Sequence, residues 1–174
     1  MGGPVTENRL DWRHYVLAFA TTLSLWVLLT ASLRADELAA GLLVALAVTV
    51  VSGPRLAVLE GVRFEAAAPL HLARYLGHFL LALVRSNLDV ARRVLAPSLP
   101  LRPAVVEVST ALRSPLGKLV LANSITLTPG TLTIDVQGDR LLVHWIDCPP
   151  DADLEANTRA IAASFERHIR GFLR

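Results

Sequence analysis

The sequence is poor in cysteine and in charge, and both shortages narrow what the protein can be. Cys148 is the single cysteine, so the chain has no intrachain disulfide and no metal site built from several thiolates. Charged residues make up 18% of the chain and apolar residues 53%, against about 25% and about 45–50% in typical soluble domains. The net charge of +2 is too small for a nucleic-acid-binding surface, which needs a clustered basic face. The composition favours a membrane protein.

Charge is absent altogether from two apolar runs near the N-terminus. Tyr15 to Leu33 contains 19 uncharged residues and Leu38 to Pro54 contains 17, and about 20 apolar residues span a bilayer as a helix. The first run is too long for a signal peptide, and the second follows after a short polar link. We therefore expect a transmembrane hairpin within residues 1–54. Because ion paths through lipid need ionisable side chains, these two helices form no such path by themselves.

Residues 55–100 are expected to form a linker and then an amphipathic helix, which Pro69 opens and Pro97 ends. This helix can lie along the membrane surface or cross the membrane as a third span. With a cytoplasmic N-terminus and two spans, every basic residue except Arg34 is on the cytoplasmic side. That pattern favours the surface helix. Its polar residues share one face, which we expect to be solvated: His71, Arg74, His78, Arg85, Asp89 and Arg92.

Residues 101–174 are expected to form a small cytoplasmic α+β domain, in the order strand, helix, strand, strand, helix. The first strand covers residues 104–109 (AVVEVS). Ser114 and Pro115 match the N-cap and first position of a helix that runs to about Asn123. After a break at Pro149 and Pro150, a final helix is expected over about 152–173, with a buried apolar stripe.

The two middle strands are predicted to form a β-hairpin framed by two turns. Thr128-Pro129-Gly130-Thr131 has the proline and glycine of a type II turn, and Gln137–Arg140 turns the chain again. In the expected register His144 lies opposite Thr133, with Asp135 diagonal to it. The alternation of apolar residues predicts one buried face made of three opposed pairs: Val136 with Leu141, Ile134 with Val143, and Leu132 with Trp145.

Serine, aspartate and histidine side chains, the residue types of a hydrolase, occur in and before the hairpin. Their pattern does not support a catalytic site. No nucleophile elbow surrounds Ser124. His71 and His78 lack the nearby third ligand that a zinc site needs, and the glycines of the hairpin lie in turns rather than in a phosphate-binding loop. The sequence therefore predicts no enzyme, no cofactor and no metal site.

A polar cluster on the amphipathic helix is the stronger candidate for binding. Arg85, Asn87, Asp89 and Arg92 lie close together on it. They could form a docking face for another protein or contact lipid headgroups at the cytoplasmic leaflet. A solvated face without a specific contact explains them equally well, so the residues alone leave these alternatives open.

Several ordered motifs carry a resemblance to a known family. LANSITLTPGT at 121–131 is followed by TIDV at 133–136 and VHWID at 143–147, with Asn87-Leu88-Asp89-Val90 and Trp26 upstream. Over about residues 15–147, the chain resembles the E-subunit family of the multisubunit Mrp-type (Mnh/Pha) sodium/proton antiporters of prokaryotes.

The resemblance implies an accessory, non-catalytic component in the plasma membrane, working with partner subunits A, B, C, D, F and G while the whole complex exchanges sodium for protons. We expect the chain to bind a partner subunit through Asn123, the Thr128-Pro129-Gly130-Thr131 turn, and the face with Thr133, Asp135 and His144. One alternative is a stand-alone membrane-anchored adaptor or sensor. Another gives Asp89 or His78 a place in an ion path that neighbouring subunits mostly supply.

Overall fold

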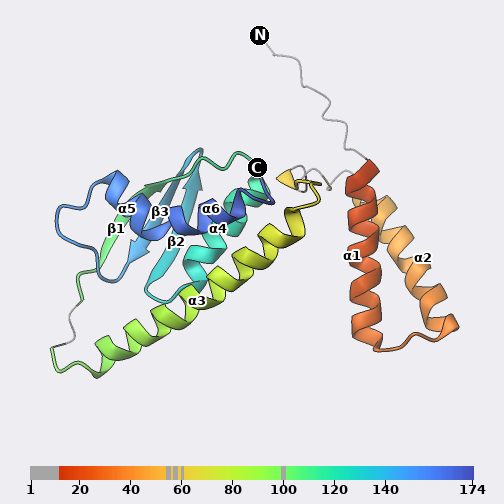
Figure 1. The fold of residues 1–174 in the computed structure, drawn as a ribbon, viewed down its shortest axis with the longest axis horizontal. Helices are drawn as coiled ribbons and strands as arrows, with labels where there is room; N and C mark the ends of the chain where they lie inside the picture. Colours follow the sequence, from red (N-terminus) through yellow and green to blue (C-terminus); the bar gives the residue numbers. More distant parts are fainter. Residues whose placement is uncertain (1–11, 54–55, 57–58, 60, 99–100) are drawn as a thin grey trace, which may run out of the picture. The chain divides into compact units, whose positions relative to one another are not determined.

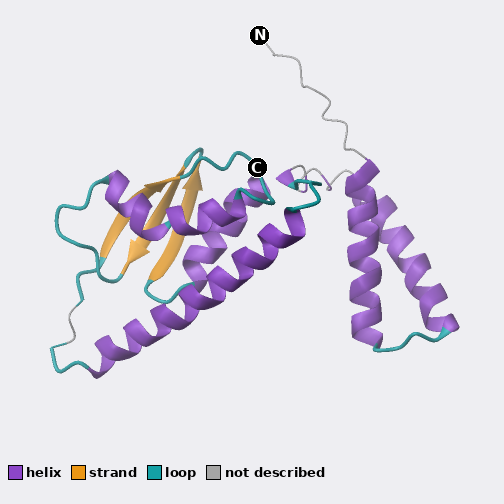
Figure 2. Cartoon of the chain, in the orientation of Figure 1, coloured by secondary structure: helices purple, strands orange, loops and turns teal. Residues whose placement is uncertain are grey.

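The chain divides into two compact units, residues 1–60 and 61–174 (Figure 1). The computed structural model describes residues 12–53, 56, 59, 61–98 and 101–174. Sequence predictions that concern residues 1–11, Pro54, Arg55 and residues 99–100 lie outside this range. Within the described residues, the first unit contains helices α1 and α2, and the second contains helices α3 to α6 and a three-stranded sheet (Figure 2).

The first unit is a pair of packed helices, α1 (Trp12–Thr30) and α2 (Ala35–Ser52). Trp26 of α1 lies against Gly41 of α2, where an added Cβ would come within 2.5 Å of the indole ring. The indole Nε1 donates a hydrogen bond of 3.0 Å to the backbone carbonyl of Glu37. The missing side chain at Gly41 therefore makes room for the tryptophan that holds the two helices together.

Apolar side chains cover much of the outside of this helix pair. Leu29 is 84% exposed and Val51 is 73% exposed, which is the reverse of a soluble helical hairpin. Within the described residues, α2 is the helix that is long and apolar enough to cross a membrane. Helix α1 begins before the predicted apolar run and has Arg13 in its first turn. The two-span hairpin itself stays a prediction.

The second unit places helices against one face of an antiparallel sheet. Strands β1 (Ala104–Ser109), β2 (Thr131–Gln137) and β3 (Arg140–Trp145) are arranged in the order β1-β3-β2. Helix α4 (Pro115–Leu127) contacts β2, and helix α5 (Leu154–Ile161) contacts β1. The mixture of helices with a small antiparallel sheet confirms the predicted class.

Two helix boundaries differ from the prediction. Helix α4 continues to Leu127 instead of ending near Asn123, while its predicted start is confirmed because the Ser114 hydroxyl accepts a hydrogen bond from the Gly117 N–H. The expected last helix is two helices, α5 and α6 (Ala163–Ile169), which meet at the fully buried Ala162. The bend there keeps the apolar stripe on the core.

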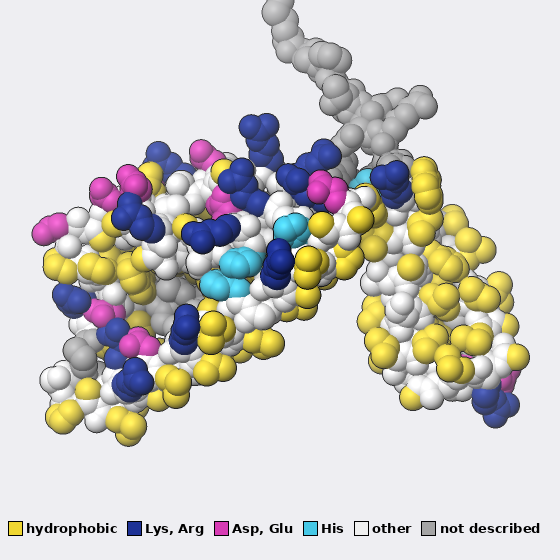
Figure 3. All heavy atoms as spheres, viewed as in Figure 1, with side chains coloured by type: hydrophobic (Ala, Val, Ile, Leu, Met, Phe, Trp, Pro, Cys, Tyr) yellow, Lys and Arg dark blue, Asp and Glu magenta, His cyan; other side chains and the backbone are white. Residues whose placement is uncertain are grey.

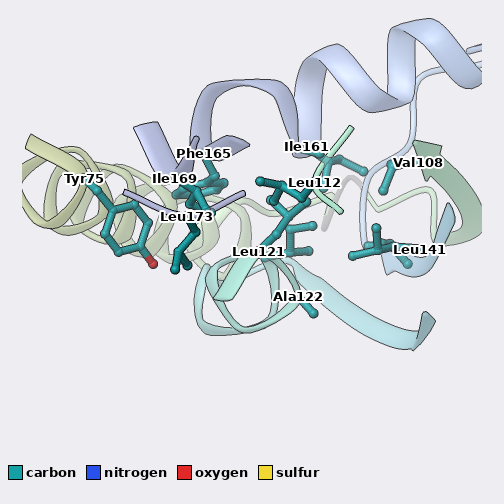
Figure 4. Packing of buried hydrophobic residues seen from close by; sticks show 13 residues of the cluster. Tyr75, Val108, Leu112, Leu121, Ala122, Leu141, Ile161, Phe165, Ile169 and Leu173 are labelled. Carbon is teal, nitrogen blue, oxygen red and sulfur yellow. The ribbon is translucent and has the colours of Figure 1, made fainter. Parts of the chain in front are cut away.

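The core lies between the sheet and these helices (Figure 4). Val108, Leu141 and Val143 come from the sheet, and Leu121 and Ile169 come from α4 and α6, all 0% exposed. Helix α3 (Ala68–Leu95) contributes Tyr75, whose hydroxyl is 2.8 Å from the buried Ser124 hydroxyl of α4. Ser124 is thus a structural contact between two helices.

The predicted hairpin register is right at its turn and wrong beyond it. Val136 pairs with Leu141 as expected, but a β-bulge between Thr133 and Asp135 adds one residue to β2. A shift of one residue moves every side chain on the far side of the bulge from the turn to the opposite face of the sheet. Leu132 and Ile134 are therefore about half exposed rather than buried. The observed partners of β3 are correspondingly different: Thr133 with Val143, Leu132 with His144, and Thr131 with Trp145.

Helix α3 has the predicted amphipathic pattern, but its polar face is not simply solvated. This face packs on α6, where His78 stacks on His168 with ring centroids 4.5 Å apart. His71 lies where a Cβ on Gly171 would come within 2.5 Å of its ring. The imidazole rings of this face pack against aromatic rings and against Gly171, so a stripe of polar residues is in part an internal contact.

Candidate partner interface

A cleft of about 410 Å³ opens between α3, the turn before β2, and helices α5 and α6. It is formed inside the second unit by segments far apart in the sequence. The walls combine apolar and charged side chains, a mixture typical of sites that bind another molecule. The residues that line it and that are used below are His78, Arg85, Asp89, Arg93, the Thr128–Thr131 turn, Trp145, Asp147, Ala160 and Phe165.

The cleft joins two stretches that the sequence suggests separately. Arg85 and Asp89 come from α3, and the Thr128–Thr131 turn comes from the most distinctive motif of the chain. Two other candidates on α3 do not line it: Arg92 is exposed on another part of the helix, and the Asn87 side chain donates to the Leu83 carbonyl of its own helix at 2.7 Å.

The Thr128–Thr131 turn is fixed in place by the strands that follow it. Gly130 has φ of +99°, the left-handed conformation that the third position of a type II turn requires, and this confirms the predicted turn. The Thr131 hydroxyl bonds to the carbonyls of Ile125 and Thr128, at 2.6 and 3.0 Å. The Ile146 N–H donates to the Gly130 carbonyl at 3.0 Å. The turn is thus a rigid wall of the cleft.

One side of the cleft is closed by a network of ion pairs that the sequence analysis missed. Arg93 of α3 bonds to Asp89 at 2.7 Å and to Asp147 at 2.6 Å, and Arg102 bonds to the other oxygen of Asp147 at 3.0 Å. The hydrogen bonds from Arg93 and Arg102 lower the pKa of Asp147. Those to Asp89 and Asp147 raise the pKa of Arg93. The VHWID motif supplied a signal, since Asp147 ends it.

A histidine pair lies at the other side of the cleft. Burial lowers the pKa of His78 below 6.5, and the positive charges of His168, Arg85 and Arg167 lower it further. The Nε2 atom of His78 is buried and has no hydrogen-bond partner within the described residues. The lowered pKa favours the neutral form of His78, which packs edge-on against Phe165 at 5.4 Å between ring centroids.

The remaining candidates lie outside the cleft. Asn123, Thr133 and Asp135 border a shallow hollow of about 370 Å³ beside β2. The Thr133 hydroxyl donates to the Ala122 carbonyl at 3.1 Å, so it ties β2 to α4. A hydrogen bond from the Gln137 side chain, and then one from the Val136 N–H, lower the pKa of Asp135.

The expected face of Thr133, Asp135 and His144 is therefore wrong in one member. His144 pairs with Val105 of β1 and Leu132 of β2 instead of Thr133. Because paired residues share a face of the sheet, His144 lies on the open face, and Asp135 is on that face beside it. Thr133 points to the helices. The bulge in β2 is the physical cause of the separation.

The described residues contain no group of three or more His, Cys, Asp or Glu side chains placed to hold a metal ion. Ser124, the candidate nucleophile considered from the sequence, is 1% exposed, and its hydroxyl bonds to the Val120 carbonyl at 2.6 Å. The chemistry that this cleft offers is binding through apolar contacts and oriented charges.

Comparison with known proteins decides the family. The family described as "Na+/H+ ion antiporter subunit" matches residues 19–171. The E1 subunit of the Na(+)/H(+) antiporter of Staphylococcus saprophyticus is 30% identical over 147 residues, covering 83% of this chain and 88% of that protein. The chain belongs to the Na+/H+ antiporter subunit family. The resemblance carried by the LANSITLTPGT motif is confirmed.

Two further relatives differ in how much of their length they share with this chain. The E subunit of the Na(+)/H(+) antiporter of Alkalihalophilus pseudofirmus is 38% identical over 93 residues, 52% of this chain, and the match spans only 57% of that relative. A chain of the structure titled "Structure of the membrane-bound sulfane sulfur reductase (MBS), an archaeal respiratory membrane complex" is 38% identical, with a TM-score of 0.79 over 90% of this chain and 97% of that chain.

Proposed function

We propose that this chain is an accessory component of a multisubunit Mrp-type Na+/H+ antiporter in a prokaryotic plasma membrane, and that it supports assembly and stability of the complex. The observation that carries the proposal is the 30% identity to an antiporter E1 subunit over 88% of its length. Helices α1 and α2 form the membrane hairpin, and residues 101–174 form a cytoplasmic domain. The partners are subunits A, B, C, D, F and G of the same antiporter.

The accessory role is supported by where ionisable residues occur. The two apolar runs, Tyr15 to Leu33 and Leu38 to Pro54, contain no Asp, Glu, His, Lys or Arg, and ion paths across a bilayer depend on such groups. In this proposal the larger subunits carry out exchange, while the exposed apolar surface of α1 and α2 packs against them or against lipid.

The cleft beside α3 is proposed as the place where the cytoplasmic domain holds a partner. Its apolar walls, Trp145 and Phe165, favour an apolar side chain of the partner. Arg85 is exposed and forms no ion pair within the described residues, so it is free to bond a carboxylate. The fitting occupant is a partner segment with an apolar residue beside an acidic one.

The test fills the cleft and measures assembly. The substitution Ala160→Trp places a large side chain on the lining of the cleft. The matched control, Glu155→Trp, adds the same side chain at an exposed position of the same helix, α5. Tagged chains are purified in mild detergent from cells that contain the whole antiporter, and the other subunits are identified by mass spectrometry.

We expect the original chain and Glu155→Trp to recover the antiporter subunits and Ala160→Trp to recover far less of them, with a parallel fall in Na+/H+ exchange by everted vesicles. A chain that purifies alone, in cells whose exchange is unchanged after its gene is deleted, would contradict the accessory role and favour the stand-alone adaptor. Equal recovery with both variants would remove the cleft from the interface.

A further inference from the structure

The long helix α3 leaves a row of apolar side chains uncovered along its whole length. The row recurs at four-residue steps through Leu76, Leu80, Val84 and Leu88, and the last of these is still 53% exposed. At about 1.5 Å per residue, the 28 residues of α3 extend for about 42 Å. Figure 3 shows hydrophobic side chains gathered along the lower edge of this helix. Such a patch on a folded domain marks a surface that something covers.

A row of arginines runs along one border of that apolar face. Arg74, Arg85 and Arg92 are separated by 11 and 7 residues, which are close to whole numbers of helical turns, so they align on one side. All three are exposed, and the ion pairs formed within the described residues do not involve them. In Figure 3, basic side chains lie just above the apolar edge of α3.

The charge on α3 is mostly of one sign, positive, as well as aligned along the helix. The helix has three arginines besides Arg74 and one aspartate, Asp89, and that carboxylate is already paired with Arg93 at 2.7 Å. No free carboxylate of the helix therefore repels an anionic surface. An apolar face bordered by arginines is the arrangement with which a helix lies in the interface of a membrane that contains anionic lipid.

One observation argues against α3 crossing the bilayer, and a second keeps the helix near the membrane. The opposite side of the helix is occupied by α6 and by the ion pairs with Asp147, so a crossing would carry a charged, folded domain into lipid. The chain between the end of α2 at Ser52 and the start of α3 at Ala68 has 15 residues. An extended link of that size reaches at most about 50 Å, which keeps α3 near the membrane if α2 spans it.

We propose that α3 lies along the membrane surface, with its exposed apolar row in the interface and with Arg74 and Arg92, which do not line the cleft, binding the headgroups of anionic phospholipids. This inference rests on the proposed membrane hairpin. It adds a lipid class to the partners of the chain and assigns the uncovered face of α3 to the bilayer, while the cleft on the other side of the helix stays open to a protein.

The experiment measures lipid contact at single labelled positions in the full chain, reconstituted at one chain per nanodisc. In a Cys148→Ser background, Leu80→Cys or Val84→Cys carries an environment-sensitive fluorophore on the apolar row. Val105→Cys, on the open face of the sheet, is the matched control, since Val105 is 55% exposed and Leu80 is 58% exposed. Quenching is measured with nitroxide lipids labelled near the headgroup or deep in the acyl chain, in phosphatidylcholine with or without phosphatidylglycerol.

We expect the labels at positions 80 and 84 to be quenched by the shallow nitroxide in discs with phosphatidylglycerol and less in phosphatidylcholine alone, while position 105 stays unquenched. In Arg74→Gln/Arg92→Gln, the ratio of embedded to detached helix should fall roughly fivefold per arginine. Unquenched labels, stronger quenching by the deep nitroxide, or no dependence on phosphatidylglycerol would each overturn the proposal. The proposal would also be overturned if the labels were shielded from water only in discs that hold several chains, because the apolar row of α3 would then be covered by a second copy.

A label at Leu43→Cys on α2 separates this inference from the function proposed above. Leu43 is 70% exposed, and in the membrane hairpin it should be quenched by the deep nitroxide. Deep quenching at position 43 with water-exposed labels on α3 would reject only the surface helix. A water-exposed label at position 43 would reject the hairpin itself.

Discussion

At the scale of single residues, the clearest functional consequence comes from His78. Its ring lies between His168 of α6 and Phe165, and burial, followed by the charges of His168, Arg85 and Arg167, lowers its pKa. Protonation would place a further positive charge in this group. Because the pKa of His78 is lower in the folded chain than in the unfolded one, the stability it contributes is present above about pH 6.5 and is lost as the pH falls toward the folded pKa.

We therefore expect the unfolding temperature of the full chain in detergent to fall between pH 7.5 and pH 5, and the variant His78→Gln to reduce that slope. The control His144→Gln changes a histidine on the open face of the sheet and should keep the slope of the original chain. Thermal unfolding followed by circular dichroism at each pH measures this. An identical slope in His78→Gln and the original chain would show that His78 does not set it.

The turns of this chain were predicted well from the sequence, and the contacts of its polar side chains were predicted less well. Gly130 and Ser114 have the conformations expected of them, because turn and cap chemistry is local. The network of Arg93 and Asp147 joins residues 54 positions apart, so no local pattern reveals it. No sequence pattern around Ser124 indicates its contact with Tyr75. Only the fold brings the two hydroxyls together.

At the scale of the elements, Gly130 and Gly77 form a matched pair for testing the turn that borders the cleft. Gly130 has φ of +99°, where a side chain costs about 1–2 kcal/mol. Gly77 lies inside α3 with open space around the position of a Cβ, where alanine is favoured over glycine by about 1 kcal/mol.

The expected result is opposite changes in stability: Gly130→Ala lowers the free energy of unfolding by about 1–2 kcal/mol and Gly77→Ala raises it by up to about 1 kcal/mol. Denaturant unfolding of the full chain in detergent measures both. A neutral Gly130→Ala would mean that the turn adopts another conformation without cost, and the rigid wall of the cleft would have to be abandoned.

Sequence patterns located the helices and strands, but they left open the strand register and the faces on which the helices pack. Alternation placed β2 and β3 correctly, but it is equally compatible with a bulge at Ile134, which depends on contacts outside the strand. Periodicity identified both faces of α3 without revealing which face the domain covers. Burial of the stripe on the last helix was expected, whereas the bend at Ala162 follows from packing against the core.

At the scale of the whole molecule, the core belongs to one unit. The clustered buried residues extend from Tyr75 to Leu173, with Val62 packed against them, and all lie in residues 61–174. We expect a fragment of residues 61–174 to fold by itself, because the buried cluster among the described residues lies wholly within it. With α3 uncovered, the fragment should self-associate in water and become monomeric with detergent or with vesicles of anionic lipid.

Circular dichroism and size-exclusion chromatography of the fragment test this expectation. A polar version with Leu80→Gln and Val84→Gln should keep the same spectrum and elute as a monomer without detergent, since both side chains are exposed. An unfolded fragment would show that residues 1–60 are needed for the core. A monomer that forms before these changes would show that the apolar row does not drive association.

The bulge in β2 has a consequence for how cells must produce this protein. It turns Leu132 and Ile134 to the open face of a strand that lies at the edge of the sheet, and edge strands with apolar side chains are templates for aggregation in water. Copies that find no covering surface are therefore substrates for chaperones and proteases. We therefore expect the steady-state abundance of the chain in cells to follow the supply of the molecules that cover it more than its own rate of synthesis.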